Sequence, residues 1–332
     1  MNGIPHLTFD LDKPGVSRGH LVVPGGADHE ELSLPVFSLN KAEGPRLLVT
    51  GGCHGNELEG PLVARRLVEW LPKAQTCGRV IVLPVLNPLA VEAWSRNTPL
   101  DGLNLNRVFP GRADGSVTER IADAVSRVLL PMADTVFDLH SFGPGWEFPP
   151  ASTTHPINDP DLMAATIKMA EAFKLPMTLV WEHPGSAGMF DTLAQNQGKV
   201  FVCAEFGGGN VSSEGLAIYE AGVRNALVAL GLVEGKADYP TFRQQKTSQT
   251  LETRRSSDEL KAPARGIFEP CCSVLDQVKQ GDLIGILYPM DSLTADAIDI
   301  CAPGACIVYA IRSGAHVEAD EGVALVARPL SR

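Results

Sequence analysis

Short apolar runs recur along the first two thirds of the chain, each bounded by glycine, proline or polar residues. Runs of this kind, rich in branched side chains, are typical of strands that are buried on both faces. They predict strands, behind an extended N-terminal stretch, at Leu47–Gly52, Val80–Leu86, Thr135–His140, Met177–Trp181 and Val200–Phe206.

Between these runs the apolar residues recur at helical spacing. The predicted helices are Pro61–Leu71, Thr118–Leu130, Asp161–Phe173 and Glu214–Leu230. Strands that alternate with helices form a largely parallel sheet covered on both faces. The pattern therefore predicts an α/β domain with a mixed, largely parallel sheet flanked by helices.

The alternation stops near residue 240, where the chain becomes polar over Tyr239–Lys261. Beyond Ala262 short apolar runs are separated by glycines, as in a small β domain. We therefore predict a catalytic α/β domain with an extended N-terminal segment at residues 1–240, and a linker and β domain at residues 241–332.

The predicted β domain contains two similar segments. The sequence A-R-G at 264–266 is similar to A-P-G at 302–304, and Val278–Asp282 is similar to Val317–Glu321. The two offsets nearly agree, which predicts two similar β halves.

Composition and charge narrow the class of protein. Of 332 residues 44% are hydrophobic and 20% charged, as in folded soluble proteins, and the net charge of -11 disfavours nucleic acid and anionic membranes as partners. The start of the chain resembles no export signal, no long apolar stretch follows, and the seven cysteines lack C-x-x-C spacing. These features predict a cytoplasmic protein with reduced thiols, and leave homo-oligomerisation open.

The segment GGCHGNE lies where a predicted strand ends and a helix begins. Open α/β sheets build their sites at this edge, and a His and a Glu three positions apart can turn toward one metal ion. His54 and Glu57 are therefore candidate zinc ligands. A glutamate at a helix start is more often a capping or dipole partner, so the pair alone leaves that alternative open.

A third candidate ligand, His140, ends another predicted strand, two residues after Asp138. Two histidines and one carboxylate with an open fourth position are a catalytic zinc arrangement. Asp138 points to the same strand face as His140 and is a candidate to orient its imidazole. The alternatives are a backbone carbonyl partner for His140 and a helix N-terminus for Asp138.

Glu205 ends an apolar strand and is followed by glycines in AEFGGG. Amide hydrolysis needs a base that takes a proton from the attacking water and returns it to the leaving amine. Glu205 is the candidate for this role, since burial near a metal tunes the pKa of a carboxyl group. The alternative is a structural ion pair with a buried arginine.

The stretch RNTPLDGLNLNRVFPG offers arginines and asparagines for oxyanion stabilisation and for anchoring a carboxylate. Its composition alone is also that of an ordinary surface turn. A similar ambiguity holds for five residues that could line a pocket or simply pack: Trp146, Glu147, Trp181, Glu182 and His183.

Taken together, the blocks GGCHGNE, RNTPLDGLNLNRVFPG, DLHS and AEFGGG resemble those of the succinylglutamate desuccinylase and aspartoacylase family, relatives of the zinc carboxypeptidases. The resemblance implies a zinc-carboxypeptidase-like fold with a C-terminal β domain that packs against the catalytic domain. That domain is similar to a barrel-sandwich of the biotinyl type, but Leu287–Pro303 contains no lysine, which argues against a carrier role.

Carried over to this chain, the resemblance implies one Zn²⁺ per chain and assigns the base role to Glu205. It implies that Arg96 polarises the scissile carbonyl and that Asn106 and Arg107 hold the substrate carboxylate. The tyrosine and arginine with which aspartoacylase holds a second carboxylate have no match in Trp146–His183. The chain is more similar to the bacterial branch that includes N-acetyl-diaminobutyrate deacetylase.

The function predicted from these features is zinc-dependent hydrolysis of the amide bond of a small N-acyl amino acid. Two alternatives are a zinc carboxypeptidase acting on short peptides and a non-catalytic metal-binding module. The second is disfavoured because all the residues needed for catalysis are present.

Overall fold

The computed structural model describes residues 3–331, except 28, 42, 183–186, 208–210, 238–239, 241, 243–247, 254–257, 291–294 and 314–315. The predicted pocket residue His183 lies outside the described residues. The described helices are α1 (Glu59–Trp70), α2 (Pro88–Glu92), α3 (Val117–Ala124), α4 (Pro160–Ala172), α5 (Phe190–Asn196) and α6 (Ser213–Ala229).

The strands of the N-terminal part are β1 (His6–Leu7), β2 (Gly15–Val23), β3 (Leu32–Asn40), β4 (Arg46–Gly51), β5 (Arg79–Leu83), β6 (Thr135–Leu139), β7 (Trp146–Glu147), β8 (Ala151–Thr154), β9 (Met177–Val180), β10 (Val200–Glu205) and β11 (Gln249–Glu252). Those that follow are β12 (Glu259–Lys261), β13 (Gly266–Pro270), β14 (Gln277–Val278), β15 (Leu283–Tyr288), β16 (Ile298–Cys301), β17 (Cys306–Arg312), β18 (His316–Val317) and β19 (Gly322–Pro329).

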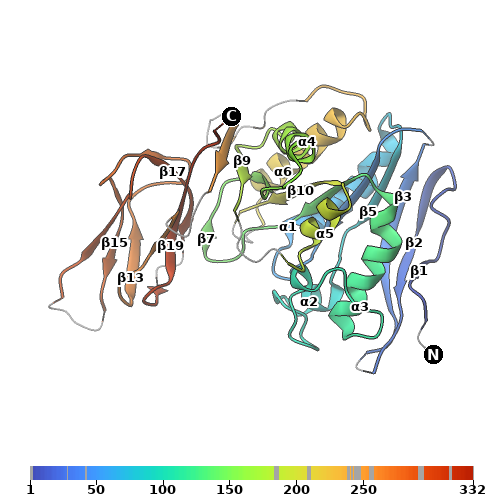
Figure 1. The fold of residues 1–332 in the computed structure, drawn as a ribbon, viewed down its shortest axis with the longest axis horizontal. Coiled ribbons are helices and arrows are strands. Elements are labelled where there is room, and N and C mark those ends of the chain that lie inside the picture. Colours follow the sequence, from blue (N-terminus) through green and yellow to red (C-terminus); the bar gives the residue numbers. More distant parts are fainter. Residues whose placement is uncertain are drawn as a thin grey trace.

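The main sheet has the order β1-β2-β3-β5-β4-β6-β10-β8-β9-β11-β19-β17-β14. Its centre, β5-β4-β6-β10, is parallel. The β2–β3 hairpin is antiparallel and joins β5 antiparallel, and β8 pairs antiparallel to β10 but parallel to β9. The predicted α/β class with a mixed, largely parallel sheet is thus confirmed, and helices cover both faces of the sheet (Figure 1).

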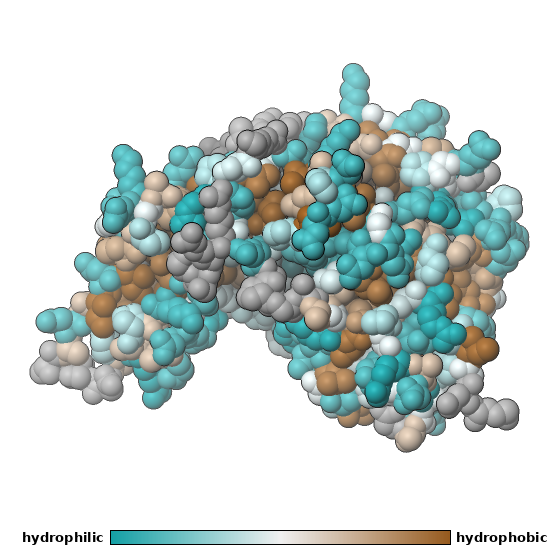
Figure 2. Space-filling model, in the orientation of Figure 1, coloured by the Kyte–Doolittle hydropathy of each residue, from teal (hydrophilic) through white to brown (hydrophobic). Residues whose placement is uncertain are grey.

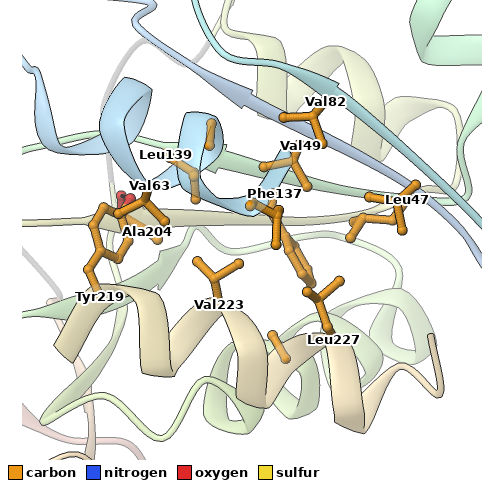
Figure 3. Close-up of a cluster of buried hydrophobic side chains, with 14 of the residues drawn as sticks. Leu47, Val49, Val63, Val82, Phe137, Leu139, Ala204, Tyr219, Val223 and Leu227 are labelled. Carbon is orange, nitrogen blue, oxygen red and sulfur yellow. Dashed lines mark hydrogen bonds between the residues drawn. The ribbon is translucent and has the colours of Figure 1, made fainter. Parts of the chain in front are cut away.

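Alternate residues of the central strands face two separate cores. Leu47 and Val49 of β4 lie in a core that includes α1 and α6, while Leu48 lies in the core that includes α3 and α5. In Figure 3 Val223 and Leu227 of α6, four residues apart, point at the sheet beside these strands. Burial on both faces is the reason why the central strands are almost wholly apolar in the sequence.

The contact between α1 and β6 is unusually close. A Cβ atom added at Gly60 would lie 2.1 Å from the backbone oxygen of Leu139, which has no room to move within the sheet. The start of α1 therefore packs directly on the end of β6. This glycine fixes the distance between the two segments that carry His54 and His140.

We expect Gly60→Ala to destabilise the protein by about 3 kcal/mol, because overpacking against backbone cannot be relieved by a rotamer change. A thermal melt of the purified protein measures the loss. Gly304→Ala is the control, since no atom lies within 4 Å of a Cβ added there. A melting temperature of Gly60→Ala equal to that of the control would contradict the close packing.

The C-terminal strands form a sandwich of two halves with the same pairing scheme. In the first half β13 pairs with β15 of the same half and with the short strand β18 of the second half. In the second half β17 pairs with β19 of the same half and with the short strand β14 of the first half. Each half thus contributes strands to both layers, in agreement with the sequence repeat. The predicted barrel-sandwich-like β domain is confirmed.

β11 joins the two parts, since it pairs parallel to β9 and antiparallel to β19. The boundary at residue 240 stays a prediction, and most residues around it lie outside the described ones. In Figure 2 hydrophilic residues cover much of both parts, and the molecule is indented between them. Among the described helices, none is long and apolar enough to cross a membrane.

Candidate active site

His54 and Glu57 lie in the tight turn that connects β4 to α1, just before the helix begins. The turn passes so close to α2 that a Cβ atom at Gly55 would lie 1.8 Å from the backbone oxygen of Ala90. Both side chains are buried, with 3% and 2% of their surface exposed. The neighbouring glycine is thus what allows the turn to bring two polar side chains inward.

His140 follows the last residue of β6, and its ring lies between two carboxylates. Its Nδ1 is 2.9 Å from Oε2 of Glu57, and its Nε2 is 2.8 Å from Oδ2 of Asp138. The other oxygen of Asp138 accepts a hydrogen bond from Thr50 Oγ1 at 2.6 Å. Asp138 therefore fixes the ring of His140 and leaves Nδ1 facing Glu57.

The donor atoms of His54, Glu57 and His140 all lie within 4.8 Å of one another. Nδ1 of His54 is 2.8 Å from Oε1 of Glu57, yet it makes no hydrogen bond with any described residue. A buried nitrogen without a hydrogen-bond partner, beside a carboxylate and a second imidazole, is what a metal site leaves when the ion is removed. Two histidines and one glutamate fit Zn²⁺ in a catalytic site.

A second group with similar spacing consists of Cys53, Asp138 and His140. Burial raises the pKa of the Cys53 thiol well above its ordinary value, and a protonated thiol is a poor ligand. Asp138 is also already engaged by Thr50 and by the ring of His140. The group with His54 and Glu57 is therefore the better metal site.

The electrostatics of the site favour a cation. Burial lowers the pKa of His140, but Asp138 and Glu57 outweigh it and raise the pKa well above its ordinary value. Burial raises the pKa of Glu57, but the adjacent imidazoles of His140 and His54 lower it further and keep the carboxylate charged. A metal ion bound here would supply the positive charge that these two carboxylates favour.

Glu205 stands at the end of β10, in the strand next to β6. Burial raises its pKa to about 7, and the nearby charge of Glu57 adds to the rise. Cys203 donates a weak hydrogen bond to its Oε1 at 3.5 Å, and Oε2 has no partner among the described residues. Among these residues, the alternative of a structural ion pair with an arginine is not observed. A carboxyl group with a pKa near neutrality suits proton transfer.

The three residues predicted to bind substrate lie around the same cavity, on the segment between α2 and α3. Nη1 of Arg96 donates to Oε1 of Glu57 at 3.0 Å, and the arginine side chain is about half exposed, at 47%. Asn106 Oδ1 accepts a hydrogen bond from the backbone of Phe190 at 2.8 Å, which leaves its amino group to face a ligand. Burial lowers the pKa of Arg107, and its neighbour Arg96 adds to this effect.

These side chains share a cavity of about 300 Å³. It lies at the ends of β4 and β6 and extends along β10, over Phe201, Cys203 and Glu205, which point to one face of the strand. The volume suits a ligand of the size of a small acylated amino acid. The structure thus brings all eight of the predicted site residues to one cavity.

Comparison with known proteins agrees with this geometry. A family model described as the succinylglutamate desuccinylase/aspartoacylase catalytic domain matches residues 43–230. The N-alpha-acetyl-L-2,4-diaminobutyric acid deacetylase of Halomonas elongata is 36% identical over 324 residues, 96% of this chain and 94% of that protein. The chain belongs to the succinylglutamate desuccinylase/aspartoacylase family. The predicted resemblance is confirmed.

Solved structures of this family superimpose closely on the chain. A crystal structure of an aspartoacylase family protein from Mesorhizobium loti is 63% identical, with a TM-score of 0.89, over 99% of this chain and 100% of that one. The product-bound ectoine utilization protein EutE (DoeB) from Ruegeria pomeroyi is 33% identical, with a TM-score of 0.88, over 98% of both chains. As a member of this family, the chain is a hydrolase of amide bonds.

For this family member we expect Asp138→Asn to lower zinc affinity roughly 10- to 100-fold, since the carboxylate that orients His140 loses its charge. A competition titration with a chelating dye measures the affinity. The control is Asp134→Asn. Asp134 lies four residues before Asp138 and forms an exposed ion pair with Arg46. Equal affinity of the two variants would show that Asp138 does not support the ligand.

Sequence reasoning missed several polar residues that line the cavity of this hydrolase, among them His155 after β8, and Asp191 and Gln195 on α5. No motif connects them, because β8 and α5 bring them together only in the fold. Of the four described candidates for the pocket wall, Trp146 and Trp181 line the cavity and Glu147 and Glu182 do not.

Proposed function

We propose that this family member is a zinc-dependent deacylase that hydrolyses the amide bond of a small N-acyl amino acid, with one Zn²⁺ per chain. The observation that carries the proposal is the meeting in one cavity of a His₂Glu donor set and the Glu205 carboxyl group, whose Oε2 has no hydrogen-bond partner among the described residues. The residues expected to hold the ion are His54, Glu57 and His140.

In such a site Zn²⁺ polarises the acyl carbonyl and makes a water molecule more acidic. The chain's own residues do the rest. Glu205 accepts a proton from the attacking water and returns it to the leaving nitrogen, because its carboxyl group has a pKa close to neutrality. The weak hydrogen bond from Cys203 holds Oε1, so Oε2 is the oxygen available for proton transfer.

Arg96 lies beside Glu57, one of the residues that would hold the ion, and it also lines the substrate cavity. A guanidinium there stabilises the negative charge that develops during the attack. Arg107 and Asn106 line the next part of the cavity and bind the substrate carboxylate, which fixes the scissile bond against Glu205.

The substrate class follows from the relatives. The Halomonas elongata protein is named for deacetylation of N-alpha-acetyl-L-2,4-diaminobutyric acid, and the Ruegeria pomeroyi protein for ectoine utilization. We infer that this chain acts on N-acetyl-diaminobutyrate or a close analogue. A cytoplasmic location and the absence of nucleic-acid and membrane partners stay predictions from the sequence.

The proposal is tested by release of free amino acid from a panel of N-acetyl and N-succinyl amino acids with the zinc-loaded protein. Turnover of a member of this panel supports a deacylase. Cleavage of C-terminal residues from short peptides without any deacylation would favour the carboxypeptidase alternative. If the zinc-loaded protein catalyses neither reaction, the remaining interpretation is a non-catalytic metal-binding module.

A further inference from the structure

The cavity wall carries polar groups that the proposed chemistry does not use. Only 7% of the surface of Gln195 is exposed. Neither its side-chain oxygen nor its side-chain nitrogen has a hydrogen-bond partner among the described residues. Leaving both ends of a buried amide unpaired costs stability, so such a group is usually retained for a ligand. Gln195 therefore indicates a binding position within the cavity.

Asp191 lies one helical turn before Gln195, so the two side chains share one face of α5. This helix packs beside β10, which carries Glu205 (Figure 1). Among the described residues, the only basic side chain within 4 Å of the Asp191 carboxylate is His155, whose Nδ1 is 3.1 Å from Oδ2. The charge of Arg107 acts on Asp191 from a longer distance, but among the described residues no lysine or arginine forms an ion pair with this carboxylate.

The chemistry of these three residues matches an ammonium group. The Asp191 carboxylate accepts a hydrogen bond from Nδ1 of His155 at Oδ2 and one from the backbone N–H of Thr192 at Oδ1, and each oxygen has a further lone pair. The amide oxygen of Gln195 is a further acceptor. These carboxylate and amide oxygens suit the N–H donors of an ammonium, and the carboxylate repels an acidic group.

The position of Asp191 decides which end of the substrate it meets. The residue before it, Phe190, donates its backbone N–H to Asn106, the residue expected to bind the substrate carboxylate. Adjacent residues lie about 3.8 Å apart, so Asp191 adjoins the carboxylate position. The group that it contacts therefore belongs to the amino acid and not to the acyl group.

We propose that Asp191, Gln195 and His155 form a subsite for a cationic side chain of the acylated amino acid, and that this subsite excludes acidic side chains. The inference rests on the proposed deacylase function. It names the feature that directs the enzyme toward a substrate such as N-acetyl-2,4-diaminobutyrate.

Three substrates of equal chain length test the subsite: N-acetyl-2,4-diaminobutyrate, N-acetylnorvaline with a methyl in place of the ammonium, and N-acetylglutamate with a carboxylate. We expect the zinc-loaded wild type to prefer the first by kcat/KM. Asp191→Asn should lower kcat/KM for N-acetyl-2,4-diaminobutyrate roughly 10- to 100-fold, mainly by raising KM. The kcat/KM for N-acetylnorvaline should change by no more than about twofold. Gln195→Leu should act in the same direction.

Asp161→Asn is a matched control, because Asp161 is also the second residue of its helix, α4, and lies outside the cavity. Equal wild-type kcat/KM for the diaminobutyrate and norvaline substrates would overturn the subsite and leave the deacylase standing. Equal losses on both substrates in Asp191→Asn would also overturn it, by showing a general structural role. No turnover of any acylated amino acid would refute the underlying function.

Discussion

Replacing Glu205 by Gln should lower kcat about 10³- to 10⁴-fold and leave zinc bound, since a general base and acid contributes on this scale. Glutamine keeps the shape of the side chain but cannot take a proton. Steady-state hydrolysis of N-acetyl-diaminobutyrate measures kcat, and metal analysis of the same samples measures zinc content. Glu234→Gln, an exposed position outside the cavity, is the matched control.

The pH profile gives an independent check on Glu205. The base must be deprotonated to act, so activity should rise with pH through its pKa. Burial raises that pKa to about 7 without a metal, and a bound cation lowers it by stabilising the carboxylate. The acid limb of the zinc enzyme is therefore expected between about pH 4.5 and 7. Full activity of Glu205→Gln, or the same acid limb in its residual activity, would assign the base to another group.

The second large effect is expected from removal of a metal ligand. His54→Ala should lose zinc and at least about 10³-fold in kcat/KM, because the charge that polarises the carbonyl goes with the ion. Nδ1 of His54 is buried and has no hydrogen-bond partner among the described residues, whereas Nε2 contacts Asn104 Oδ1 at 3.1 Å, so Nδ1 is the nitrogen expected to bind the ion. Zinc content after gel filtration and kcat/KM are the measurements.

An exposed histidine in the C-terminal domain, His316, provides the control, and His316→Ala should retain both zinc and activity. Retention of stoichiometric zinc and activity by His54→Ala would show that the metal is held elsewhere. The neighbouring group with Cys53 and Asp138 would then be the next candidate.

Much of the fold could be predicted because burial on two faces leaves a plain signal. β4, β6 and β10 are continuous apolar runs, and each begins within one residue of its predicted start. β8 could not be predicted in this way, since Ala151–Thr154 is buried but largely polar. Its hydroxyl groups find partners only in the folded chain, as when Ser152 donates to the backbone of Ala170.

The site residues also differ in how far the sequence could predict them. His54 and Glu57 are three residues apart, so local spacing predicts that they lie together. His140 directly follows β6, and Glu205 ends the neighbouring strand β10, so the ends of adjacent parallel strands predict the rest of the cluster. His155 and Asp191 are 36 residues apart and meet only because β8 and α5 lie beside β10. Such a contact depends on tertiary packing and leaves no local pattern.

Recovery of activity during zinc titration tests the central claim most directly. Chelator-stripped protein is titrated with Zn²⁺, and hydrolysis of N-acetyl-2,4-diaminobutyrate is followed at each step. The proposed site predicts that stripped protein is inactive and that activity returns in proportion to zinc, reaching its maximum at one ion per chain. Full activity in metal-free protein, or maximal zinc binding without any hydrolysis of acylated amino acids, would contradict it.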